Sequence, residues 1–343
     1  MINLPGSSDV KNLNRWQAAA TMTVSMALAV VMAFDPAAMQ AAQLNTDARA
    51  SIPENIQQII VVDYRAMQNS AAAMQLKNKV LPPELKSLEQ TLKNSGLQVD
   101  QDADTLAFAA FRISDSSGSS NASSDANTRI LGVAQGQFDT QAIMAQFAKK
   151  KTKPFMVRNN AIYPMGSGGM SVSFLNETTM VFGSRDAVEA ALDARDGLQP
   201  NFLQNSQMMN EMTAIDSDAV WSILDQKGTQ TMMKGVLGEA SGLEDFDTVK
   251  NQMKDANYTM DFSNGVRFNL TVDMGSTMTA ATAATVLKGV ALMKEASGSS
   301  QEKDALNNTT IDSAGGVLTV SYASSDSQFA GLLQSPLFQQ VVK

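Results

Sequence analysis

The longest apolar run of the chain lies close to the N-terminus. From Trp16 to Phe34 no residue is charged, Lys11 and Arg15 precede the run, and Asp35-Pro36 follows it. A basic flank, an apolar stretch and alanine-rich sequence are the layout of a secretory signal. The run also has the ~20 residues that span a bilayer as a helix. A third interpretation is a buried core helix of a soluble protein. An ordinary surface helix is disfavoured, because it would carry a polar stripe and this run has none.

We therefore expect residues 1–15 to remain cytoplasmic and residues 16–34 to be a signal peptide or a transmembrane anchor. Both readings place the membrane at residues 16–34 and the bulk of the chain outside the cytoplasm, because positive charge holds the N-terminal flank inside. The small-residue cleavage sites after the run are imperfect, so the choice between signal and anchor stays open.

Beyond this segment the pattern predicts a polar linker over 35–51, followed by alternating strands and helices. Apolar runs bounded by turn residues predict strands, and apolar residues at three- and four-residue spacing predict helices. Strands are expected at 59–64, 105–112, 129–138, 155–163, 170–174 and 179–182, and helices at 67–79, 83–95, 140–151 and 185–195. The serine-rich segment 114–128 is expected to be a flexible loop.

The second half repeats this order in outline. The matched strands are expected at 220–225, 258–262, 266–273 and 317–322, and the matched helices at 229–237, 246–255 and 279–295. The two glycine pairs, Gly168-Gly169 and Gly315-Gly316, open similar apolar strands. We therefore predict an α+β protein of two tandem repeats, 52–198 and 199–343. Each repeat would have the order β-α-α-β-β-α-β-β-α, form its own antiparallel sheet and cover it with helices.

Charge and composition narrow the function. The net charge is −8 and the pI about 4.7, so the surface repels phosphate backbones and nucleic acid is not an expected partner. The densest basic run, Lys149-Lys150-Lys151 with Lys153, stands at a predicted helix end before Pro154. Cations are favoured there by the helix dipole, and an anion or anionic-lipid contact is the alternative.

The chain has no histidine and no cysteine. This excludes disulfides, thiolate nucleophiles and cysteine-ligated clusters and removes the commonest general base. Any catalysis would depend on carboxylates, Lys, Tyr or Ser. Stability has to come from packed cores, since no disulfide can supply it.

Three short motifs resemble known sites only in part. Asp100-Gln101-Asp102-Ala103-Asp104 has the opening spacing of a calcium loop, but Thr105 and Phe111 stand where that loop needs a glycine and a final acid. Gly166-Ser167-Gly168-Gly169 leads into a strand, whereas phosphate-binding loops open a helix. We interpret the first as a solvated loop and the second as a hairpin turn.

Ser300-Gln301-Glu302-Lys303 fits a serine–lysine catalytic spacing, which works only when the lysine is desolvated. Its surroundings are polar, so we interpret it as a loop. The many methionines are typical of core filling, although thioethers also bind Cu(I); the clusters are Met208-Met209 with Met212, and Met232-Met233. Trp16 is expected at a membrane interface and Trp221 in a core.

Asp63 and Asp225 each end the opening strand of a predicted repeat. Symmetry could bring the two carboxylates together at the repeat interface, where like charges would raise one pKa. The alternative is that each aspartate caps the helix that follows it.

The opening IPENIQQIIVVDYRAMQNS, with the apolar segment and the duplicated α+β plan, resembles uncharacterised bacterial exported or membrane-anchored proteins. In these proteins a proline-led strand ending in Val-Asp begins each unit. The resemblance covers 52–338 and implies no activity, no cofactor and no site residue.

Taken together, these patterns predict a non-enzymatic cell-envelope protein that binds a protein or small-molecule partner or has a structural role. The alternative is a hydrolase of envelope polymers that works with carboxylates or a Ser/Lys pair. No catalytic, cofactor or metal residue is assigned.

Overall fold

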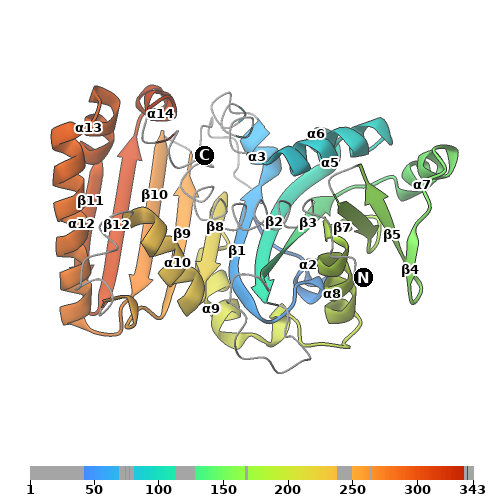
Figure 1. The fold of residues 1–343 in the computed structure, drawn as a ribbon, viewed down its shortest axis with the longest axis horizontal. Coiled ribbons are helices and arrows are strands. Elements are labelled where there is room, and N and C mark those ends of the chain that lie inside the picture. Colours follow the sequence, from blue (N-terminus) through green and yellow to red (C-terminus); the bar gives the residue numbers. More distant parts are fainter. Residues whose placement is uncertain are drawn as a thin grey trace, which may run out of the picture.

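The computed structural model describes residues 42–68, 74, 77, 81–112, 128–166, 169–237, 249–262, 265–335 and 338. Their strands form one 12-stranded antiparallel sheet of order β11-β12-β10-β9-β8-β1-β2-β3-β7-β6-β5-β4 (Figure 1). The predicted α+β class with antiparallel pairing is thereby confirmed. The apolar segment 16–34 and the serine-rich segment 114–127 lie outside the described residues.

The first seven strands come from the N-terminal half and the remaining five from the C-terminal half. The strands are β1 (Ile56–Asp63), β2 (Ala103–Arg112), β3 (Thr128–Gly136), β4 (Phe155–Val157), β5 (Asn160–Met165), β6 (Met170–Phe174), β7 (Thr179–Ser184), β8 (Val220–Leu224), β9 (Asp255–Asp261), β10 (Val266–Asp273), β11 (Thr309–Ala314) and β12 (Val317–Ser324). β11 was not among the predicted strands, because its alternating residues are all partly or fully exposed and give no apolar run.

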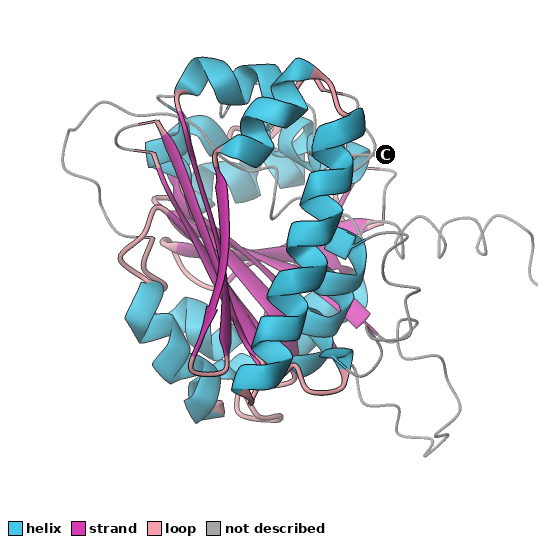
Figure 2. Ribbon diagram, turned by 90° about the vertical axis from the view of Figure 1, so that its left-hand side faces the viewer, coloured by secondary structure: helices cyan, strands magenta, loops and turns pink. Residues whose placement is uncertain are grey.

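Helices lie on both faces of this sheet (Figure 2). They are α2 (Thr46–Ser51), α3 (Tyr64–Gln68), α5 (Pro83–Asn94), α6 (Val99–Asp102), α7 (Thr140–Lys149), α8 (Arg185–Arg195), η1 (Phe202–Gln204), α9 (Ser206–Ile215), α10 (Gln226–Leu237), α12 (Thr277–Ser297), α13 (Ser300–Asn307) and α14 (Asp326–Leu332). None of the helices in the described part of the chain combines the length and apolar character that a membrane span requires.

Alternation along β1 divides the core into two sides. Ile59 and Val61 pack on one face against α2, α8 and α9. Ile60 and Val62 point to the other face, which α10, α12 and α14 cover over the C-terminal half. On that same face α5 and α7 cover the N-terminal half. Successive strand residues point to opposite faces, so a fully buried strand such as β1 needs apolar residues throughout.

The two halves join through the backbones of β1 and β8, which pair antiparallel with Val61 opposite Trp221. The prediction that each half forms its own sheet is therefore wrong. An edge strand leaves backbone N–H and C=O groups unpaired. Here β1 and β8, the first strand of each half, pair these groups with one another. The strands of one half do not interleave with those of the other.

The expected linker 35–51 differs from the structure in its second part. Residues 46–51 form α2, whose N-cap Asn45 accepts a hydrogen bond from the Ala48 backbone N–H at 2.8 Å. Ala42, Leu44 and Ala48 are buried in the core beneath it. The segment was predicted to be a linker because most of its residues are polar, but its few apolar residues are buried against the core.

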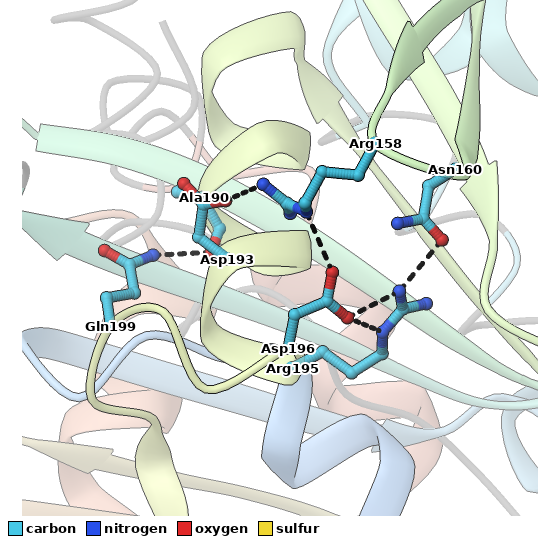
Figure 3. A network of polar contacts seen from close by, with 7 residues as sticks. All are labelled: Arg158, Asn160, Ala190, Asp193, Arg195, Asp196 and Gln199. Carbon is cyan, nitrogen blue, oxygen red and sulfur yellow. Dashed lines mark hydrogen bonds and ion pairs between the residues drawn. The ribbon is translucent and has the colours of Figure 1, made fainter.

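The hairpin β4–β5 is tied to the end of α8 by a surface network (Figure 3). Arg158 contacts Asp193 at 2.7 Å and Asp196 at 3.1 Å. Arg195 joins the same Asp196 and donates to Asn160 at 2.8 Å. The network holds the short outermost strands against the helix.

Candidate ligand-binding cavity

A cavity of about 60 Å³ lies between the N-terminal half of the sheet and α5. Its walls are apolar except at one end, where Tyr64, Lys77 and Glu89 stand. The apolar wall consists of Leu81, Leu85, Leu88, Leu92, Leu97, Val99, Ala103, Leu106, Phe108, Ala134, Phe138, Met180 and Phe182. An apolar hollow with a few polar groups at one side is the usual form of a small-molecule site.

The floor of the cavity follows from the register of β2, β3 and β7. Leu106 lies opposite Ala134, and Ala134 lies opposite Met180. Because Ala134 has the smallest side chain of this row, the sheet surface is depressed there. Phe108 and Phe182, on the adjacent row, meet edge to face with ring centroids 5.9 Å apart and border the depression.

The roof is α5. Pro82 and Pro83 start this helix, since proline is tolerated in the first turn and disfavours helix before it. Leu85, Leu88 and Leu92 then recur at helical spacing and face the sheet, and Leu88 and Leu92 are buried. The sequence predicted this helix and its apolar face.

A cluster of charged and polar groups stands at the polar end. The Lys77 ammonium donates to Tyr64 Oη at 2.5 Å and to Glu89 Oε1 at 2.8 Å, and it lies 3.4 Å from Asp100 Oδ1. Tyr64 Oη donates to the same Asp100 oxygen at 2.6 Å. The Lys77 side chain is 13% exposed, so the ammonium is shielded from water although it borders the cavity.

The cluster changes the proton affinities of its members. Burial, followed by the hydrogen bond to Asp100, raises the pKa of Tyr64 well above its usual range, so the phenol stays protonated. Burial opposes the charge of Asp100, but the hydrogen bond from Tyr64 and the nearby Lys77 outweigh it and lower the pKa of Asp100. At neutral pH the Tyr64 phenol is therefore neutral and the Asp100 carboxyl is ionised.

Asp100 belongs both to the motif singled out in the sequence and to the polar cluster beside the cavity. The segment Asp100–Asp104, expected as a solvated loop, instead forms the one-turn helix α6 and the start of β2. Asp102 accepts from the backbone N–H of Gln98 at 2.7 Å, and Asp104 pairs with Arg65. The carboxylates thus point to different partners rather than to one cation.

The other motifs lie away from the cavity. Gly166 and Gly169 flank the β5–β6 hairpin with positive φ angles of 64° and 72°, which confirms the predicted turn. The Ser300–Lys303 motif is not in a loop, because Ser299 caps α13 with a capping box to Glu302. Ser300 and Lys303 are exposed on that helix, so the lysine is not desolvated.

Asp63 and Asp225 are not brought together. They stand at opposite ends of the β1–β8 pair, roughly 20 Å apart at about 3.3 Å per residue. Asp63 Oδ1 accepts from the Ala66 backbone N–H at 2.7 Å, and Asp225 Oδ1 accepts from Gly228 N–H at 2.7 Å. Each aspartate therefore caps the next helix, as the alternative interpretation expected.

The remaining interpretations concern packing. Met208, Met212, Met232, Met233 and Trp221 are buried in the cores, and α7 ends at Lys149, where Lys150 donates to the Asn94 carbonyl at 2.7 Å. Trp16 lies outside the described residues. No group of three or more acidic residues in the described ranges is arranged to hold a metal ion.

The cavity itself was missed by sequence reasoning. Lys77 and Glu89 lie in separate segments, and Ala134 has no distinctive neighbour in the chain. Their meeting depends on strand register and helix packing. The one available signal was Tyr64-Arg65 directly after a buried strand, followed by isolated charges in an apolar region.

Comparisons with known proteins find only distant similarity in structure. No family model matches the chain, and no curated protein sequence matches it. In structure it is similar to crystal form I of TP0453, with 9% identity, a TM-score of 0.45 and coverage of 88% of this chain and 98% of that one. For crystal form III the values are 10%, 0.47, 85% and 98%. Likeness at this level establishes neither common descent nor function.

Proposed function

We propose that the protein is a non-enzymatic binding protein whose ligand is a small amphiphile held in the cavity beneath α5. The observation that carries the proposal is an apolar hollow between helix and sheet, with hydrogen-bonding side chains gathered at one end only. That polarity matches a molecule with an aliphatic part and one polar head. A ligand of this kind gains binding energy from each buried methylene group.

The lining also supports binding more than hydrolysis. Carboxylate-based hydrolysis of glycosidic polymers uses a pair of acidic groups that flank the bond. The described lining contains one carboxylate, Glu89, and its charge is already engaged by Lys77. The hydrolase alternative therefore has less support than binding.

The compartment remains part of the proposal. We infer that residues 16–34 direct the chain to or across a membrane and that the domain operates in the cell envelope, because this run is uncharged and follows a basic flank. A reporter that is active only outside the cytoplasm, fused after Ser51, tests this inference. A silent reporter in full-length fusion protein would contradict it.

We also propose that the two halves arose by duplication. The order β1-β2-β3-β7-β6 on one side of the junction has the same form as β8-β9-β10-β12-β11 on the other. The strands after the glycine pairs, β6 and β12, do not hold equivalent places in these orders, so this best sequence match does not support the proposal. An experimental structure whose halves fail to superpose about an axis between β1 and β8 would refute it.

The binding proposal is tested by filling the cavity. In Ala134→Leu, added methyl groups would occupy the depression between β2 and β7, whereas Ala323→Leu adds the same atoms at an exposed position of β12. The probe is 1-hexanol, followed through the ¹³C-methyl resonance of Met180, which lines the cavity. Met212, buried on the opposite face of the sheet, supplies the reference signal.

The wild-type protein and Ala323→Leu should show a saturable shift of the Met180 methyl and no shift of Met212. Ala134→Leu should remain folded and lose the Met180 response, because filled cavities leave stability unchanged or raised. A wild-type protein without a response, or a folded Ala134→Leu variant that responds like the wild type, would overturn the proposal.

A further inference from the structure

The hydrogen-bond inventory at the polar end of the cavity defines the head of the ligand. This inference rests on the binding proposal and goes beyond it. A lysine ammonium has three N–H donors and no acceptor. Those donors face three oxygens, on Tyr64, Glu89 and Asp100. The single donor of the Tyr64 hydroxyl is taken by Asp100.

The carboxylates of the cluster can still accept hydrogen bonds from a ligand. An ionised carboxylate accepts at about four lone-pair sites, and Lys77 uses the Oε1 atom of Glu89. Glu89 is one of the residues that line the cavity, and Lys77 does not use its second carboxylate oxygen. The formal charges of the hydrogen-bonded cluster, one ammonium and the carboxylates of Glu89 and Asp100, sum to about −1; Lys93, outside the cavity lining, adds a positive charge near Asp100.

We propose that the cavity selects an amphiphile whose head donates hydrogen bonds, with a primary ammonium preferred over a hydroxyl and both preferred over a carboxylate. Glu89 is the residue that receives the head. An ammonium neutralises the cluster and finds an acceptor at its oxygen. For a carboxylate head, the described donors of Lys77 and Tyr64 are already engaged, and the carboxylates of the cluster carry charge of its own sign, which costs affinity in a shielded site.

The size of the hollow limits the tail. A water-sized group needs about 10–15 Å³ of such a cavity, so a cavity of about 60 Å³ accommodates about four to six methylene-sized groups. A six-carbon chain is therefore the longest that this volume accommodates, with its head beside Glu89. The ligand class is a short-chain alkylamine or the short exposed end of a larger amine-bearing molecule.

The experiment compares three probes of one length at pH 7: hexylammonium, 1-hexanol and hexanoate. Each is titrated into the full chain and followed by the Met180 methyl resonance. Hexylammonium should bind about tenfold more tightly than hexanoate, because a hydrogen bond to a charged group is gained in one case and refused in the other. The affinity of hexanol should lie between them.

Two variants locate the selectivity. Glu89→Gln should abolish the preference for hexylammonium and strengthen hexanoate, because it removes the negative charge at the cavity and leaves Lys77 a weaker, neutral acceptor. Glu84→Gln removes the same charge from the same helix outside the cavity lining and should leave the ranking unchanged. Lys77→Met is the second probe of the cluster and should weaken hexanoate further, which keeps the test decisive if Glu89→Gln fails to fold.

The outcomes separate the two proposals. Absence of binding by every probe, hexanol included, would overturn the binding proposal and this inference with it. Binding of hexanol together with hexanoate equal to or tighter than hexylammonium would overturn the assignment of the head alone. An unchanged ranking in folded Glu89→Gln would show that Glu89 does not receive the head and would also refute it.

Discussion

Asp63 and Asp225 occupy equivalent places at the two ends of the β1–β8 pair. The backbone N–H of Asp63 donates to the Ala219 carbonyl at 2.7 Å, and that of Asp225 donates to the Gln57 carbonyl at 2.9 Å. Each carboxylate then caps the helix that leaves its strand. Burial is the largest influence on both and raises the pKa of each. The charged neighbours differ, because Asp225 is paired with Arg112 whereas Asp63 has Asp104 and Arg65 nearby.

Because only Asp225 has an arginine partner, substitution of aspartate by asparagine should affect stability differently at the two positions. Asp63→Asn should preserve stability at pH 7 to 8, since asparagine is as good a cap and carries no charge to desolvate. Asp225→Asn should destabilise the protein, because it leaves the half-buried Arg112 guanidinium without its counter-charge. Chemical denaturation of both variants measures the contrast.

Alanine supplies the control for capping. Asp63→Ala should lower the free energy of unfolding by ~1 kcal/mol through loss of the cap. If Asp63→Asn were as destabilising as Asp63→Ala, the carboxylate charge rather than the cap would be stabilising, and the interpretation would fail.

Gly132 shapes the cavity border from inside β3. It lies directly opposite Phe182, and a Cβ atom added to Gly132 would be 2.2 Å from the Phe182 ring. Gly132→Ala should therefore displace the ring and destabilise the protein by about 1–3 kcal/mol, as overpacking does. It should also weaken hexanol binding, because the cavity is the open space beside the ring. Thermal unfolding and the Met180 titration test both effects, and unchanged values for both would contradict the packing described for this row.

Much of the secondary structure could be predicted from the sequence because its signals are local. The run Ile59 to Val62 marks a fully buried strand, and the spacing of apolar residues predicts α5. The single continuous sheet could not be predicted, because nothing local states that β1 accepts β8 as its neighbour. Strand partners far apart in the chain are chosen by burial and backbone pairing.

The candidate site was less predictable than the fold. Its donors and acceptors meet through packing, so Lys77 carries no local mark that distinguishes it from other lysines. Asp100 was noticed for its spacing with Asp102 and Asp104, but its role follows from contact with Tyr64. Spacing drew attention to the residue, but the interpretation as a solvated loop missed its contact with Tyr64.

Glu211 on α9 predicts a pH dependence of stability. Burial, and then the charge of Asp255, raise its pKa from 4.5 to about 7. Between pH 4.5 and about 7 the Glu211 carboxyl is neutral in the folded protein, whereas in the unfolded chain it is ionised. Its contribution is therefore fully present below pH 4.5 and is lost as pH rises through about 7.

Glu211→Gln removes this titration while preserving the hydrogen-bonding side chain. The variant should match the wild type near pH 4 and be more stable than the wild type at pH 8. Urea unfolding at both pH values, with Glu84→Gln as a charge control on α5, measures the difference. Equal stability of Glu211→Gln and the wild type at pH 8 would show that the Glu211 carboxylate is not penalised there.

The last prediction concerns the polar contact that crosses the junction of the two halves. The buried amide of Gln58 on β1 donates to Ser222 Oγ on β8 at 3.2 Å and to Tyr258 Oη on β9 at 3.5 Å. Hydrogen bonds weaken with length, so the link to Ser222 should dominate. We expect Ser222→Ala to cost ~1 kcal/mol, and Gln58→Met more, because it leaves two buried hydroxyl groups without this donor. If the contact couples the halves, the double variant should cost less than the sum of the single variants by more than the ~0.5 kcal/mol within which independent sites add. Additive losses in a denaturation cycle would mean that the Gln58–Ser222 contact does not couple β1 to β8.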